Sequence, residues 1–218
     1  MYFEDRMQAG SLLAAQLVEQ YRYENCAVVA LSDGGVLVGE QIAAELHCAL
    51  MMIISEDVEI PGEGMSFGGV SQNGHFTYNS ELSSGEIEGY TSEFFGYLNE
   101  QKREAFQRIN RLLGDGGIID LDLLRDRVVI LVNDGFANDT AVGVALDFLK
   151  PVRMQRLVIA APVATVDVVD RLHVTADELH ILDVKSNYLG VDHYYDSNDL
   201  PTHEETIAYI NEIILKWR

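Results

Sequence analysis

The residues best suited to chemistry follow the apolar run Val128–Val132. They form the short polar loop Asn133-Asp134-Gly135-Phe136-Ala137-Asn138-Asp139, which leads into a predicted helix at Thr140. A helix N-terminus after such a loop is an anion site, because its free backbone N–H groups and its dipole point to one place. This loop contains two acids, Asp134 and Asp139, and no Lys or Arg. It therefore has the layout of a phosphate site and a charge that opposes phosphate.

A second polar loop, Ser32-Asp33-Gly34-Gly35, follows the apolar run Ala27–Leu31. Helical spacing of apolar residues resumes directly after it, over Val36–Leu46. Strand, loop, helix and a further apolar run at Ala49–Ile54 together indicate a βαβ unit. Ligands of parallel sheets bind outside the carboxyl ends of the strands. Both polar loops are therefore expected to line one crevice.

The elements around these loops alternate between strand and helix, which predicts an α/β fold with a doubly wound, mainly parallel sheet in a single domain over residues 1–218. Asn73-Gly74 predicts a type I′ turn inside a β-hairpin insertion. Thr202 and Glu205 predict a capping box. The other expected elements are helix Met7–Tyr21, hairpin Ser66–Tyr78, a long helical stretch Glu86–Leu113 ended by Gly114–Gly117, strand Val128–Val132, helix Thr140–Leu149, strand Leu157–Ala161, helix Val166–His173, strand Glu178–Leu182 and helix Glu204–Trp217.

The net charge of the chain disfavours polyanionic partners. The chain has 35 acids against 15 bases and a net charge of −20, so nucleic acids and anionic membranes are expected to be repelled. No apolar run approaches the roughly 20 residues of a membrane span, and no signal peptide is evident. Cys26 and Cys48 lie in apolar stretches and are expected to be buried, inert thiols. A cytoplasmic protein is the expectation, and the six histidines show no spacing that indicates a metal site.

Several segments, in order along nearly the whole chain, resemble a bacterial branch of the type I phosphoribosyltransferases. Ala30-Leu31-Ser32-Asp33-Gly34-Gly35-Val36 is similar to the branch's pyrophosphate loop, usually Leu-Pro-Arg-Gly-Gly-Val. The run from Val129 to Ala137 is similar to its ribose-phosphate motif, usually Val-Ile-Leu-Val-Asp-Asp-Gly-Leu-Ala-Thr-Gly-Ala-Thr. Three further segments fit the branch: the opening Phe3–Gly10, the strand and turn Ala160–Ala164, and the closing Leu189–Asp196.

The resemblance implies transfer of ribose 5-phosphate from phosphoribosyl pyrophosphate (PRPP) to a nitrogen nucleophile, with Mg²⁺. It implies that Asn133 and Asp134 hold the ribose hydroxyls and act as the catalytic pair. The remaining crevice positions would bind the rest of PRPP. They are Asp33, Gly34 and Gly35 at the pyrophosphate, Gly135 in the motif, and Ala137, Asn138, Asp139 and Thr140 around the 5-phosphate, with a mobile loop at 55–65 closing over the leaving group.

The chain departs from the family at these working positions. Asp33 stands where the family usually has Arg, and Ser55–Glu59 stands where the branch has an Arg-Lys pair. Asn133 replaces the first of two acids, and Asn138–Ala141 replaces Thr-Gly-Ala-Thr. Two like unit charges about 4 Å apart cost on the order of 4 kcal/mol at an effective dielectric of 20. Asn138 or Asp139 is expected to cap the following helix and so fill the anion site.

Three hypotheses follow. The favoured one is a protein with a degenerate PRPP site, a pseudoenzyme that acts as a binding or regulatory homologue or as a partner subunit. The second is a divergent, active, Mg²⁺-dependent phosphoribosyltransferase that acts on a nucleobase-like acceptor. The third is a protein that binds a cation or an amine through Asp33, Asp134, Asp139 and Glu56. The expected partners are PRPP or a nucleotide-like small molecule, and a homodimer partner through Glu86–Leu113 or another protein.

Overall fold

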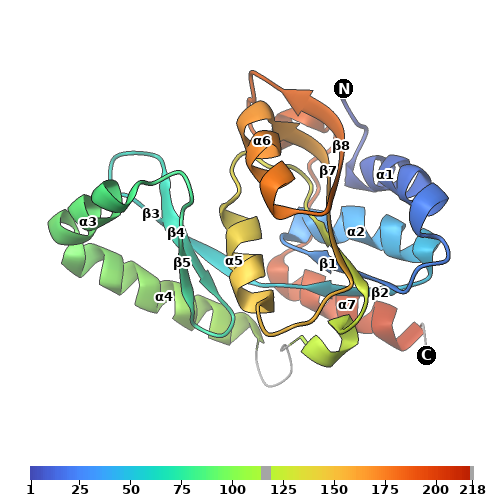
Figure 1. Ribbon diagram of the computed structural model, residues 1–218, viewed down its shortest axis with the longest axis horizontal. Coiled ribbons are helices and arrows are strands. Elements are labelled where there is room, and N and C mark those ends of the chain that lie inside the picture. Colours follow the sequence, from blue (N-terminus) through green and yellow to red (C-terminus); the bar gives the residue numbers. More distant parts are fainter. Residues whose placement is uncertain (114–118, 217–218) are drawn as a thin grey trace. The chain divides into compact units, whose positions relative to one another are not determined.

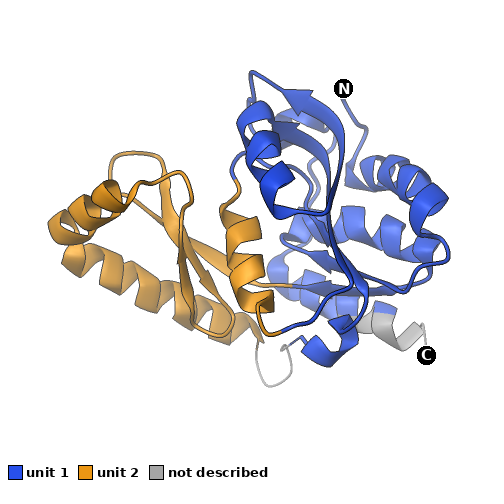
Figure 2. Ribbon diagram, in the orientation of Figure 1, with its two compact units in different colours: residues 1–52, 119–138, 152–218 blue, residues 53–118, 139–151 orange. Residues whose placement is uncertain are grey.

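The computed structural model describes residues 1–113 and 119–216. Contacts between Cα atoms divide the chain into two compact units. Unit 1 comprises Met1–Met52, Ile119–Asn138 and Val152–Arg218, and unit 2 comprises Ile53–Ile118 and Asp139–Pro151 (Figure 2). The expectation of a single domain over 1–218 stays a prediction.

Unit 1 contains a five-stranded sheet in the order β2-β1-β6-β7-β8, and every neighbouring pair of strands is parallel (Figure 1). The predicted α/β class with a mainly parallel sheet is confirmed. The chain order of the strands reverses between β1 and β6, and this is the place where open α/β sheets bind ligands. The strands are β1 Cys26–Ala30, β2 Ala49–Met52, β6 Val128–Val132, β7 Arg156–Thr165 and β8 Glu178–Lys185.

Helices α1 and α2 pack on each other, and one apolar core joins them and α7 to a single face of the sheet. α6 contacts β7 and β8, and its buried residues Val168 and Leu172 lie outside that core. The predicted capping box is present, because Glu205 N–H donates to Thr202 Oγ1 at 3.3 Å and Thr202 N–H donates to Glu205 Oε2 at 2.8 Å. The helices are α1 Arg6–Tyr21, α2 Asp33–Leu46, α6 Val166–Thr175 and α7 His203–Lys216, with 3₁₀ turns η1 Leu121–Leu124 and η2 Val191–Tyr194.

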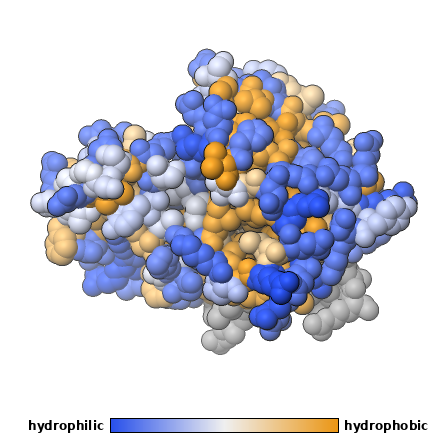
Figure 3. Space-filling model, in the orientation of Figure 1, coloured by the Kyte–Doolittle hydropathy of each residue, from blue (hydrophilic) through white to orange (hydrophobic). Residues whose placement is uncertain are grey.

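The described residues of unit 2 form a three-stranded antiparallel sheet in the order β3-β4-β5 and three helices. Its visible surface is mostly hydrophilic, which agrees with the polar composition of the stretch from 86 to 113 (Figure 3). The elements are β3 Ser55–Glu59, β4 Ser66–Ser71, β5 Phe76–Tyr78, α3 Ser84–Glu93, α4 Phe95–Leu113 and α5 Thr140–Leu149.

The hairpin β4–β5 is where the sequence predicts it, but its turn differs from the predicted type I′. Gly74 N–H donates to Ser71 O at 2.8 Å, Ser71 N–H donates to His75 O at 2.9 Å, and Gly74 has a φ of 80°. Asn73 does not have a positive φ, which a type I′ turn requires. The three-residue connection is a type I turn closed by a glycine bulge, a common alternative for an Asn-Gly pair.

Two other expectations in unit 2 are wrong. The stretch Glu86–Leu113 is two helices, because the backbone of Phe94 leaves the helical region at φ −111° and ψ 24°. Ser55–Glu59, expected in the mobile loop 55–65, is strand β3, paired with β4 in spite of its polar sequence. The predicted helix stop at Gly114–Gly117 lies outside the described residues, as does Trp217, the predicted last residue of the final helix.

Among the described residues, no helix is both long enough and apolar enough to cross a bilayer.

Candidate functional site

The ends of β1 and β6 bring the two polar segments together in unit 1. The two strands pair in parallel with Ala30 opposite Val132, so the residues after them leave the same edge of the sheet. Leu31 N–H then donates to Val132 O at 3.0 Å and extends this pairing. The two polar loops, predicted as Ser32–Gly35 and Asn133–Asn138, therefore both begin at the reversal point of the sheet.

The segment expected to be a pyrophosphate loop is the start of a helix. Ser32 is the N-cap of α2, with extended backbone, and its Oγ accepts a hydrogen bond from Gly35 N–H at 2.8 Å. Asp33, Gly34 and Gly35 form the first turn. A serine N-cap followed by an acid is a strong local signal for helix initiation. The backbone N–H of Gly35 is thereby bonded inside the protein.

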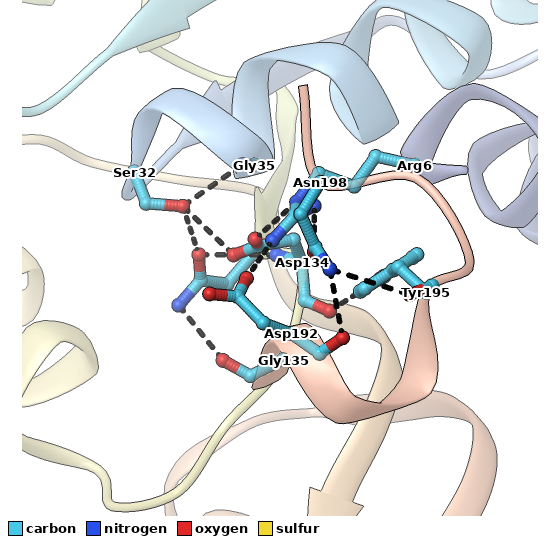
Figure 4. Close-up of polar contacts among 9 residues, drawn as sticks. Arg6, Ser32, Gly35, Asp134, Gly135, Asp192, Tyr195 and Asn198 are labelled. Atoms are coloured by element: carbon cyan, nitrogen blue, oxygen red, sulfur yellow. Dashed lines mark hydrogen bonds and ion pairs between the residues drawn. The ribbon is translucent and has the colours of Figure 1, made fainter. Parts of the chain in front are cut away.

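Asp134 is buried and lies at the centre of the polar cluster drawn in Figure 4. Its Oδ2 accepts a hydrogen bond from Arg6 Nε at 2.7 Å, and its Oδ1 accepts one from Ser32 Oγ at 3.0 Å. The side chains of Arg6 and Asp134 are 2% and 9% exposed. Both oxygens of the carboxylate are thus bonded to groups of the chain.

The other nitrogens of Arg6 bind the closing segment of unit 1. One terminal nitrogen donates to Asp192 Oδ1 at 2.6 Å and the other donates to Asn198 Oδ1 at 2.9 Å. The guanidinium lies over the ring of Tyr195, 4.4 Å from its centroid. Burial by itself would lower the pKa of Arg6, but the hydrogen bonds to Asp134 and Asp192 outweigh it and leave the pKa raised. The cation is therefore fixed from three directions.

Tyr195 also holds the backbone of the loop, because its hydroxyl donates to Asp134 O at 2.6 Å. Burial and the nearby Asp134 carboxylate raise the pKa of this phenol, so it stays a donor at neutral pH. The neighbouring rings of Tyr188 and Tyr194 contact each other, with centroids 5.3 Å apart.

The side chain of Asn133 is also bonded within the loop. Its Nδ2 donates to Gly135 O at 3.1 Å, and its Oδ1 accepts from Asp134 N–H at 3.1 Å and also contacts Ser32 Oγ. Gly135 has no room for a side chain, since a Cβ there would lie 2.7 Å from Val191 Cγ2 and 2.8 Å from Tyr188 Oη. The predicted catalytic pair, Asn133 and Asp134, thus lies together but is turned toward the protein's own groups.

Gly34 is needed for the approach of α2 to this cluster. A Cβ at this position would lie 2.0 Å from Asp134 Oδ2 and 2.8 Å from Arg6 Nε, closer than atoms can come. In this structure the glycine that matches the family's pyrophosphate loop makes room for an internal ion pair.

Asp33 faces the last helix of unit 1. Its Oδ1 lies 2.8 Å from Nδ1 of His203, the first residue of α7. This acid, which stands where the family usually has a basic residue, is thus engaged by an imidazole.

The predicted 5-phosphate positions are divided between the units. Ala137 is exposed and Asn138 is half-buried, both in unit 1. Asp139 and Thr140 are buried and belong to unit 2.

Asp139 is the N-cap of α5, but its side chain makes no capping hydrogen bond. Its two carboxylate oxygens instead accept from Ser80 Oγ at 2.9 and 2.8 Å. The expected side-chain cap is therefore wrong for Asp139, because its φ of −102° and ψ of 9° depart from the extended backbone that usually directs such a cap.

The four acids that the cation hypothesis joins each have a partner within their own unit. Glu56 Oε2 accepts from Arg108 Nε at 3.0 Å, while Asp33, Asp134 and Asp139 contact His203, Arg6 and Ser80. Within residues 1–113 and 119–216, no three His, Cys, Asp or Glu side chains are arranged to hold a metal ion.

The sequence patterns did not place Arg6, Asp192 or Asn198 in the site. The available signal was indirect: the opening segment at 3–10 and the closing segment at 189–196 each match the family pattern. In the structure a parallel bridge pairs Phe3 with Tyr195 and so joins these segments.

Known proteins agree with this architecture. The phosphoribosyl transferase domain profile matches residues 4–197. The Mycobacterium tuberculosis protein Rv0571c, provisionally named a phosphoribosyl transferase, is 24% identical over 211 residues; the match covers 96% of this chain but only 46% of that protein. The chain thus spans about half the length of the curated relatives that it matches.

Two solved structures share the fold. The protein TT1426 from Thermus thermophilus has a TM-score of 0.73 and 26% identity over 97% of this chain and 99% of that one. AQ2163 from Aquifex aeolicus has a TM-score of 0.50 and 11% identity over 93% and 84%. Because the family profile covers most of the residues, the chain belongs to the phosphoribosyl transferase family.

Proposed function

We propose that this protein is a non-catalytic member of the phosphoribosyl transferase family, with a degenerate PRPP site and a binding or regulatory role. The observation that carries the proposal is the state of Asp134, whose two carboxylate oxygens are bonded to Arg6 and Ser32. By resemblance this acid would receive the ribose hydroxyls of PRPP. Binding PRPP there would require these internal bonds to break, and the buried Arg6 would lose one of its two carboxylate partners and keep only Asp192.

The charges at the crevice support the same proposal. PRPP is a polyanion, and Asp33 stands at the position that would face its pyrophosphate. Two like unit charges about 4 Å apart cost on the order of 4 kcal/mol at an effective dielectric of 20. A micromolar affinity is worth only about 8 kcal/mol in total. A single misplaced acid could therefore remove much of the affinity for PRPP.

The residues present do not fit the Mg²⁺ that the family chemistry uses. Mg²⁺ takes oxygen ligands in octahedral geometry, usually one or two carboxylates together with substrate phosphates. At the unit 1 site, Asp134 is bonded to Arg6 and Ser32, and Asp33 lies against His203. No step of a reaction is therefore assigned to Mg²⁺ here.

The test is titration calorimetry with PRPP and Mg²⁺ on the natural protein and on the double variant Asp33→Arg, Asp139→Gly. The natural protein is expected to show no binding at micromolar concentrations. The double variant is expected to gain measurable affinity, because it removes two acids and adds one cation at family positions. Micromolar binding by the natural protein, followed by pyrophosphate release when nucleobases are added, would overturn the proposal and favour the divergent enzyme.

A matched control distinguishes the effect of charge at the crevice from the effect of the chain's net charge on the affinity for PRPP. Asp170→Arg with Asp126→Gly makes the same change of net charge at exposed positions of unit 1, and Asp126 has a φ of 55°, which glycine adopts readily. This control should behave like the natural protein. Thermal melting of both double variants checks that they fold, since Asp139→Gly removes the contact with Ser80.

A further inference from the structure

Unit 2 holds a lysine ammonium among three aromatic rings. Lys102 Nζ, on α4, lies 3.7 Å from the ring centroid of Phe76 and 5.3 Å from the centroids of Phe67 and Tyr78. The ring of Tyr78 is nearly perpendicular to those of Phe67 and Phe76, at 89° and 86°, and the three centroids lie 5.1 to 5.8 Å apart. We call these three rings the aromatic cage.

The sequence of the hairpin β4–β5 places the rings of the aromatic cage next to one another. Phe76 and Tyr78 are two residues apart on β5, so their side chains leave the same face of the strand. Gly68, paired with Tyr78 on the neighbouring strand β4, has a φ of 154°. A Cβ at Gly68 would lie 2.7 Å from Phe76 Cζ and 2.1 Å from Thr77 O, so only glycine allows the ring of Phe76 this position.

The cage holds its cation without a carboxylate. Although the chain has 35 acids, Lys102 forms no ion pair with any described residue. Its neighbours on α4 do pair: Arg103 with Glu100 at 2.6 Å and Arg108 with Glu56 at 3.0 Å. Aromatic faces attract cations through their quadrupole, and they suit weakly hydrated, methylated ammonium groups.

The cage also opens to water and its present occupant is flexible. Phe67 is fully buried, but Phe76 is half-buried and Tyr78 is 44% exposed. Lysine carries its ammonium on a four-carbon stem with freely rotating bonds. The side chain of Lys102 can therefore leave the cage without unfolding α4.

From this geometry we propose that Phe67, Phe76 and Tyr78 form a binding site for a small organic cation with a methylated ammonium group, and that Lys102 is an internal competitor for it. The net charge of −20 raises the local concentration of such cations. The inference rests on unit 2 alone and does not depend on the proposed loss of PRPP binding.

The experiment is an NMR titration with tetramethylammonium that follows the methyl resonance of the probe. Ring currents move this resonance upfield when the cation is enclosed by aromatic faces. Lys102→Ala removes the competitor and is expected to bind the probe about tenfold more tightly than the natural protein, equivalent to about 1.4 kcal/mol. Adding Tyr78→Leu to Lys102→Ala should abolish the upfield shift, and the exposed position of Tyr78 makes this second change safe for folding.

Arg103→Ala is the matched control, because it removes the same charge from the neighbouring, exposed position of α4. It should leave the affinity for tetramethylammonium at the natural value. Equal affinity of Lys102→Ala and the natural protein would overturn the proposal. So would an upfield shift that survives Tyr78→Leu, or a gain in Arg103→Ala equal to that in Lys102→Ala.

Discussion

Two cations in this acidic chain are withdrawn from water in different ways. In unit 1, Arg6 is bonded to two carboxylates and an amide and covers the ring of Tyr195. In unit 2, Lys102 lies against three aromatic rings, and burial lowers its pKa. A planar guanidinium has five donors that fix several acceptors at once, whereas an ammonium on a flexible stem fixes none in place.

This difference in bonding indicates that the two cations have different roles. Arg6 and its partners Asp134, Asp192 and Asn198 join the start of the chain, the loop after β6 and the closing segment. This cluster therefore stabilises one arrangement of the crevice. The aromatic cage exerts a weak, non-directional attraction, so its occupant can be exchanged. Substitutions in the two regions should therefore differ greatly in their effect on stability.

The largest effect is expected from Arg6→Met. Removing one partner of a buried ion pair leaves an uncompensated charge, here on Asp134, and typically costs about 3–5 kcal/mol. Urea unfolding should show this loss of free energy of unfolding. Arg22→Met, at the exposed end of the same helix, should change stability by less than about 0.5 kcal/mol.

The pair can be tested further with the double variant Arg6→Met, Asp134→Asn. Because the second change removes the unpaired charge, the double variant should be more stable than Arg6→Met alone. If Arg6→Met lowers the free energy of unfolding by less than about 1 kcal/mol, a structural role for the pair is contradicted.

The next effect is expected from Gly34→Ala. A methyl group there would meet Asp134 Oδ2 at 2.0 Å, so the ion pair must open or α2 must move, at a cost of about 1–3 kcal/mol. Thermal melting gives the comparison with Gly85→Ala in α3, where a Cβ meets nothing within 4 Å. Gly85→Ala should be neutral or slightly stabilising, and equal melting temperatures for the two variants would refute the close approach at Gly34.

A smaller effect is expected from Lys102→Met, which keeps the apolar stem and removes the charge. An exposed cation–π contact is worth about 0.5–1 kcal/mol, and the lost desolvation penalty offsets part of it. The free energy of unfolding from urea titrations should fall by less than about 1 kcal/mol. A loss as large as that of Arg6→Met would mean that the two cations are equally structural.

The smallest effect concerns Asp57 on β3, whose pKa is raised to about 6 by desolvation and by repulsion from Glu56 and Glu59. A raised pKa means that the folded state favours the proton, so this group's contribution to stability is present below about pH 4 and is lost as the pH rises through 6. Asp57→Asn should therefore stabilise the protein at pH 7. The carboxyl loses part of its hydration but the residue is exposed, so screening by water keeps the gain below about 1 kcal/mol.

This gain should disappear below about pH 4, where Asp57 is protonated in both states. Melting temperatures of Asp57→Asn and the natural protein across pH 3.5 to 8 give the test. A gain that is constant over this range would show that repulsion at Asp57 is not its cause.

The candidate site was predicted from the sequence in part. Strand Val128–Val132, the two polar segments at one sheet edge and the hairpin position followed from local patterns. The family resemblance correctly indicated the family. The helix after the first polar loop was expected to begin at Val36, but Ser32 caps a helix that already begins at Asp33. The role of this segment at a pyrophosphate stays a prediction.

The sequence by itself determined what depends on neighbours along the chain. The apolar run at 128–132, the helical spacing at 140–149 and the capping box at Thr202 and Glu205 each rely on residues within a few positions. Short-range signals of this kind remain readable whatever the tertiary packing.

Only the tertiary structure decided which partner each charge takes. Arg6 and Asp134 are 128 positions apart in the chain, and Arg6 and Asn198 are 192 apart. The chain has 35 acids and 15 bases, so its composition allows many pairings of similar charge. The packing of the sheet and its helices determines which acid pairs with which base, because a buried ion pair forms only where the fold removes both groups from water at the same place.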